Sequence, residues 1–88
     1  MVFQKTIRLE TSGRGSYPLT RVIQEVVQES GIQTGLCHAF LQHTSASLIL
    51  CENADPDVVH DILLTLNSHF PQDKPGYRHM EGNSDSHV

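Results

Sequence analysis

Two neighbouring segments, residues 34–42 and 46–52, constrain the fold most, because each alternates like a strand and is largely apolar on both faces. In the first segment Leu36 and Phe40 fall on one face and Leu41 falls on the other. A strand that is apolar on both faces must be covered on both sides. We therefore expect a helix layer on one side of these strands and a second sheet or a partner subunit on the other.

The turn at residues 43–45 joins the two segments into a predicted antiparallel hairpin, in which residue i lies opposite roughly residue 88 minus i. Cys37 and Cys51 then fall on adjacent strands at about the same rung. Two cysteines are too few for a disulfide scaffold and are not spaced as a zinc pair, so we expect buried free thiols. His38 is expected to be a packed or hydrogen-bonded core histidine.

Residues 2–10 alternate between polar and apolar side chains, which predicts a strand with one solvent-exposed face. The sequence before Pro18 is compatible with a short second strand but does not require one. From Leu19 to Gly31 the apolar residues recur at helical spacing, and glycine is a common helix stop. A second helix is predicted from Asp55 onward to a stop at Pro71. The resulting order, β(β)αββα, indicates a single α+β domain, residues 1–88, with antiparallel strands and two amphipathic helices on one face.

The formal net charge of −4 is uneven along the chain. Residues 51–88 carry two Lys/Arg against seven Asp/Glu, so no basic face is available for a phosphate backbone and nucleic-acid binding is excluded. No apolar stretch is long enough to span a bilayer, and the first residues do not resemble a signal peptide. A cytoplasmic protein without membrane association is therefore expected.

Polar residues gather at the hairpin turn, at the start of the second helix and in the tail, where the chain has almost nothing to bury. Two interpretations stay open for the first cluster, since Thr44, Ser45 and Ser47 either make turn hydrogen bonds or bind an anion. The tail is either a disordered end or an ordered site, in which Gly82 allows a tight turn and Ser84 caps a helix starting at Asp85. His60 and His69 are expected to be solvated surface residues.

Three motifs carry a family resemblance: His-Thr-Ser-Ala-Ser-Leu at 43–48, Glu-Asn-Ala-Asp-Pro-Asp at 52–57, and Tyr-Arg-His-Met-Glu-Gly-Asn-Ser-Asp-Ser-His at 77–87. In this order and spacing they resemble the YjbQ-like family, also described as secondary thiamine-phosphate synthases. The resemblance covers essentially the whole chain. It implies an α+β sandwich that assembles as a homotrimer. Family members continue past His87 into a helix and further strands, so residues 1–88 would form an incomplete YjbQ-like domain without the C-terminal strands.

The resemblance also implies an activity, the joining of a hydroxymethylpyrimidine diphosphate to a thiazole phosphate with release of pyrophosphate. A small phosphorylated ligand and a divalent metal, Zn or Mg, would then be bound. The catalytic candidates are the clustered histidines and carboxylates, His43, His79, His87, Glu81 and Asp85. The same three histidines, His43, His79 and His87, are the metal candidates. Ligand-binding candidates are Thr44, Ser45, Glu52, Asn53, Arg78 and Asn83. The alternative is a trimeric protein that binds metal or a small ligand without turnover.

Overall fold

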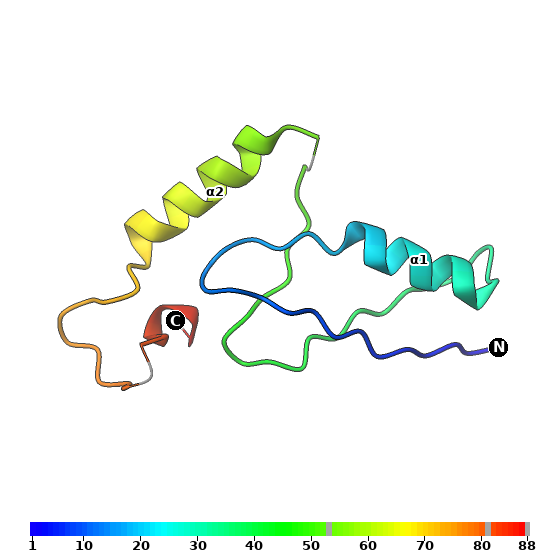
Figure 1. Cartoon of the computed structure of the whole chain (residues 1–88), viewed down its shortest axis with the longest axis horizontal. Helices are drawn as coiled ribbons and strands as arrows, with labels where there is room; N and C mark the ends of the chain where they lie inside the picture. The colour runs from blue at the N-terminus through cyan, green and yellow to red at the C-terminus, as the bar shows by residue number, and fades with distance from the viewer. Residues whose placement is uncertain (53, 81, 88) are drawn as a thin grey trace. The chain divides into compact units, whose positions relative to one another are not determined.

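The computed structural model describes residues 1–52, 54–80 and 82–87 and contains three helices in these ranges. They are α1 (Thr20–Ser30), α2 (Pro56–His69) and α3 (Ser84–His87), and Figure 1 shows them joined by long irregular segments. The chain divides into two compact units, Met1–Ala39 and Phe40–Val88. None of the helices in the described ranges has the length and apolar character that a bilayer crossing requires.

The first unit is built on α1, whose apolar stripe predicts the helix correctly. Val22, Ile23 and Val26 are half-buried on one face, while the glutamines and glutamates between them are exposed. The helix ends at Gly31, which adopts the left-handed conformation (φ 71°) and whose N–H donates to the carbonyl of Gln28 at 3.1 Å. A side chain other than glycine would be strained at this φ.

In the same unit the loop before α1 is closed by Tyr17. The backbone N–H of Ser12 donates to the phenolic oxygen at 3.0 Å, and the hydroxyl lies 2.8 Å from the carbonyl oxygens of both Ser12 and Gly13. An ion pair between Lys5 and Glu29 (2.5 Å) connects the N-terminal segment to the last turn of α1. These polar contacts order residues that the sequence assigns to a strand and a turn.

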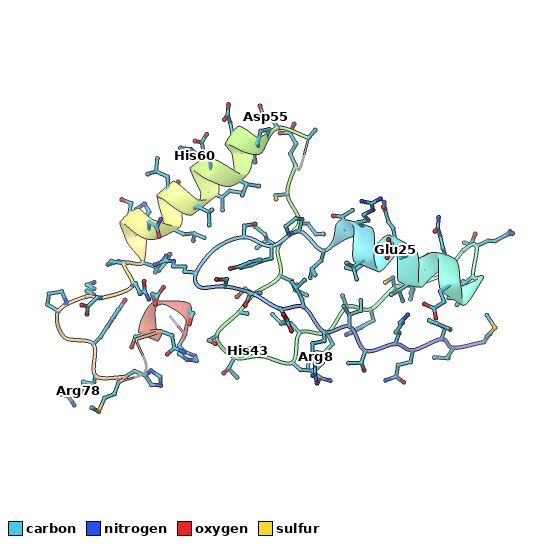
Figure 2. All side chains as sticks on the ribbon, viewed as in Figure 1. Arg8, Glu25, His43, Asp55, His60 and Arg78 are labelled. Atoms are coloured by element: carbon cyan, nitrogen blue, oxygen red, sulfur yellow. The ribbon has the colours of Figure 1, made fainter. Side chains whose placement is uncertain are left out.

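The second unit contains α2, which begins as the sequence predicts. The N–H of Asp57 donates to the side chain of Asp55 at 2.9 Å, and Pro56 occupies the first turn, where its missing N–H costs nothing. Figure 2 shows Asp55 at the start of this helix. The last turn closes with the N–H of Phe70 donating to the carbonyl of Leu66 at 2.7 Å, directly before Pro71. His60 and His69 are exposed, which confirms their prediction as surface residues.

The predicted α+β sandwich is wrong for this structure, because the described residues contain helices and no strand. Segments 2–10, 34–42 and 46–52, which the sequence assigns to antiparallel strands in the order β(β)αββα, are irregular. The described ranges leave much of their apolar surface open: Leu36 and Leu50 are each 103% exposed, Leu41 is only half-buried, and no apolar side chain is fully buried. Two strands alone are marginal in water, so without covering layers the hairpin has no source of stability.

Two further expectations depended on that sheet and fail with it. His38, predicted to be a core histidine, is exposed. Cys37 and Cys51 are free, as predicted, but both are exposed and not buried.

Candidate functional site

The tail after α2 turns back on itself and places two histidines in contact. The rings of His79 and His87 meet edge to face, with centroids 5.2 Å apart and planes inclined by 64°. They are brought together by a turn at Gly82 (φ 76°) and by the short helix α3. The positive φ at Gly82 confirms the predicted tight turn, and its carbonyl accepts a hydrogen bond from the side chain of Gln72 at 3.3 Å.

Helix α3 begins at Ser84, one residue before the predicted start. The carbonyl of Asn83 accepts from the N–H of Ser86 at 3.1 Å and from its hydroxyl at 2.6 Å, which fixes the first turn. Ser84 is only 9% exposed, whereas His87 on the same short helix is exposed. Residues 82–87 thus form a turn and a short helix, the arrangement that the site interpretation expects, and the choice between a site and a disordered end stays a prediction.

Arg78, His79, Ser84 and His87 line one open hollow. Figure 2 shows Arg78 on the segment that leads from α2 towards α3. The residues around the hollow carry a guanidinium, two imidazoles and a hydroxyl, which can donate hydrogen bonds to anionic oxygens, although the surface that faces the hollow is mostly apolar carbon. These side chains suit a phosphorylated small molecule better than a cation, since an Arg⁺ beside a metal ion would repel it.

Ser84 is the residue of this hollow that the sequence assigned only to helix capping. A signal was present, because Ser84 and His87 are three residues apart and lie on one face of a helix. Asn83, a predicted ligand-binding residue, is half-buried, and its side-chain oxygen Oδ1 is buried without a hydrogen-bond partner in the described structure. Asp85, a predicted catalytic residue, is half-buried in α3.

The histidine of the hairpin-turn cluster has a different partner. His43 Nδ1 lies 3.0 Å from the backbone nitrogen of Ser45 and 2.9 Å from its hydroxyl. Thr44 and Glu52, two other predicted ligand-binding residues, are exposed. The contacts of Ser45 match the turn interpretation of this cluster, and they leave anion binding by Thr44 a prediction.

Two predicted site residues, Asn53 and Glu81, lie outside the described residues. Within the described ranges no three His, Cys, Asp or Glu side chains lie close enough together to hold a metal ion. The assignment of His43, His79 and His87 to a metal site therefore stays a prediction.

Comparison with known proteins identifies the family. A family model described as UPF0047 protein YjbQ-like matches residues 5–88. The chain is 46% identical over 76 residues to UPF0047 protein sll1880 of Synechocystis, covering 86% of this chain and 52% of that protein. It is 36% identical over 85 residues to UPF0047 protein YugU of Bacillus subtilis, covering 96% of this chain and 64% of the relative.

A third relative, UPF0047 protein YjbQ of Escherichia coli O157:H7, is 39% identical over 92 residues, with 100% of this chain and 66% of the relative covered. The chain thus spans about half to two thirds of the length of these curated relatives. No solved structure gives a significant match. The family match over residues 5–88 and the identities to these relatives agree, and the chain belongs to the UPF0047 family of YjbQ-like proteins.

Proposed function

We propose that this chain contributes a phosphate-binding site to thiamine-phosphate synthase-type chemistry. In this reaction a thiazole phosphate joins a hydroxymethylpyrimidine diphosphate and pyrophosphate is released. The observation that carries the proposal is the hollow lined by Arg78, His79, Ser84 and His87. A planar guanidinium can grip two phosphate oxygens at once, and the imidazole N–H and serine O–H groups add single donors.

The chemistry requires little more than such donors. The thiazole nitrogen attacks the methylene carbon of the pyrimidine, so a C–N bond forms as the C–O bond to the diphosphate breaks. The electron pair of the broken bond leaves with pyrophosphate, where negative charge develops. Donors that are already in place around the departing oxygen stabilise this charge more than they stabilise the ground state. In this proposal Arg78 and the two imidazoles have that role.

A divalent metal, the cofactor that the family resemblance implies, would neutralise part of the same charge. Catalytic zinc sites use three protein ligands, and His79 and His87 supply two. Magnesium prefers oxygen ligands and is commonly held through one or two carboxylates and the phosphates of the substrate. The described residues that line the hollow include no carboxylate. The described residues thus do not fit a protein-held metal by themselves, and no step of the reaction is assigned to one.

The second candidate is a homotrimeric protein that binds a small phosphorylated ligand or a metal without turnover. One observation favours it: Arg78, His79 and His87 are all exposed. An open site admits water, which competes with the thiazole nitrogen for the pyrimidine carbon and weakens each electrostatic contact. Simple binding tolerates such exposure better than group transfer does. Light scattering of the purified chain tests the trimer directly.

An assay of pyrophosphate release from the two substrates separates the candidates. If the chain catalyses the transfer, His87→Ala and Arg78→Gln should each lower the rate of pyrophosphate release by about 10²- to 10³-fold, the usual effect of removing one donor to the developing charge. His69→Ala is the matched control, because His69 is exposed on α2 and lies outside the hollow. Pyrophosphate binding without release would support the second candidate. The absence of both pyrophosphate binding and pyrophosphate release would reject both candidates.

A further inference from the structure

His43 has two contacts that bear on which of its ring nitrogens carries the proton. The backbone N–H of Ser45 points at Nδ1 with a nitrogen-to-nitrogen distance of 3.0 Å. The Ser45 hydroxyl oxygen lies 2.9 Å from the same atom. Figure 2 shows His43 on the irregular segment before α2, where its ring is otherwise exposed.

The amide is the decisive partner, because a backbone N–H can only donate a hydrogen bond. Nδ1 must therefore accept, which requires a lone pair and no proton on that nitrogen. In a neutral imidazole the proton then lies on Nε2. The hydroxyl of Ser45 can donate to the same lone pair and strengthens this choice. His43 consequently presents an N–H group to solvent at Nε2.

Metal-ligating histidines have the opposite arrangement. They coordinate through one nitrogen while the other ring N–H donates to a carboxylate or carbonyl. For a metal bound at Nε2 of His43, Nδ1 would have to donate a hydrogen bond, but here Nδ1 accepts one. Nε2 would need a free lone pair for the metal, but in this tautomer Nε2 carries the proton. His60 provides a contrast within the chain, since its Nδ1 lies 3.2 Å from the carboxylate oxygen of Asp61, which can only accept from it when ionised.

We propose that Ser45 is a positioning residue that holds His43 in the Nε2–H tautomer, so that His43 donates to an anionic oxygen of a phosphorylated ligand and is not a metal ligand. The tautomer follows from the contacts of Ser45 alone. The choice of a phosphorylated ligand rests on the proposed function. This assignment separates His43 from His79 and His87, with which the family resemblance groups it.

The tautomer is measured by long-range ¹H–¹⁵N NMR of the histidine rings in the full chain at alkaline pH, where neutral rings are observed. The share of the Nε2–H form should be highest for His43, intermediate for exposed His69 and lowest for His60. Ser45→Ala keeps the backbone N–H and removes the hydroxyl, so the ratio of the Nε2–H to the Nδ1–H form should fall about two- to tenfold but stay above that of His69, whereas Ser45→Thr should restore it. An Nε2–H share for His43 no greater than that of His69 would overturn the positioning role.

Titration with inorganic pyrophosphate and with Zn²⁺ alone tests the ligand. Pyrophosphate should shift the Nε2–H signal of His43, and its affinity should fall about tenfold or more in His43→Ala and less in His43→Gln, whose side-chain amide retains a donor. The Zn²⁺ affinity of His43→Ala should equal that of the unaltered chain. A tenfold loss of Zn²⁺ affinity would overturn the proposal.

The same titration distinguishes the two proposals from each other. If pyrophosphate shifts His43 but not His79 or His87, the hollow of the tail is not the phosphate site and this inference stands. If it shifts His79 and His87 but not His43, the donor role is refuted and the proposed function stands. If it shifts none of them, both fail.

Discussion

The imidazole of His79 meets the edge of the imidazole of His87, with ring centroids 5.2 Å apart at an interplanar angle of 64°. This geometry is a favourable arrangement for two aromatic rings. The contact therefore has two separable components, the packing of rings and the hydrogen-bonding capacity of their nitrogens. Only the second serves a phosphorylated ligand.

Replacement of His87 by Phe separates these components. The His87→Phe ring can keep the edge-to-face contact with His79, so the turn at Gly82 and α3 should persist. The lost N–H donor should lower pyrophosphate affinity about 10- to 100-fold, the effect of removing one hydrogen bond to a charged group. Calorimetry gives the affinity, and the NMR signals of α3 report its structure. His69→Phe is the control, and unchanged affinity in His87→Phe would remove this imidazole from the site.

Replacement of Asp55 tests the start of α2. Its side chain accepts from the N–H of Asp57 at 2.9 Å, so Asp55→Ala should destabilise the helix by about 1 kcal/mol. Asp55→Asn keeps an acceptor oxygen and should cost much less. Circular dichroism measures the helix content, and exchange of the Asp57 amide proton reports the bond itself. Equal losses in the two variants would show that charge, and not the hydrogen bond, stabilises this end of α2.

Replacement of Gly31 tests the end of α1. No heavy atom lies within 4 Å of a Cβ built at this position, so Gly31→Ala meets no steric contact and only the left-handed backbone (φ 71°) opposes it. The expected cost is about 1–2 kcal/mol of helix stability. Gly15→Ala is the matched control, because the added Cβ would make ordinary contact with Tyr17 at 3.7 Å. Protection of the α1 amides from hydrogen exchange gives the comparison, and equal protection would refute the strain.

The helices were predictable because their signals are local. Asp55 and Pro56 specify a helix start through contacts within one turn, and Gly31 specifies a stop through its own φ. A helix satisfies its backbone hydrogen bonds within one segment. The predicted strands need partners distant in the chain, and the exposure of Leu36 and Leu50 shows that the described residues do not provide them.

The candidate site was predictable in part for the same reason. His79 and His87 are eight residues apart, and one turn with a glycine at its centre is enough to bring their rings into contact. Ser84 was missed as a site residue because its burial depends on how α3 packs and not on its neighbours in sequence. The role of His43 depends on the direction of one backbone N–H, which residue types do not encode.

The ion pair between Lys5 and Glu29 provides the last prediction, because it links residues 24 apart within the first unit. Its side chains are 44% and 52% exposed, so the coupling energy from a double-mutant cycle of Lys5→Ala and Glu29→Ala should be about 0.2–1 kcal/mol. Hydrogen exchange of the last-turn amides of α1 measures it. At 1 M salt the Debye length falls to about 3 Å, and the coupling should then largely vanish.

The pair Arg21–Glu25 on α1 is the matched control for this cycle. Its atoms are 4.0 Å apart and its side chains are 93% and 68% exposed, so its coupling should be smaller, at most about 0.5 kcal/mol. Equal couplings for the two pairs would mean that the shorter contact of Lys5 adds nothing beyond general helix electrostatics. A larger coupling for Lys5 and Glu29 would show instead that this ion pair holds the irregular N-terminal segment against α1. The described residues form no sheet whose backbone hydrogen bonds could hold that segment in place.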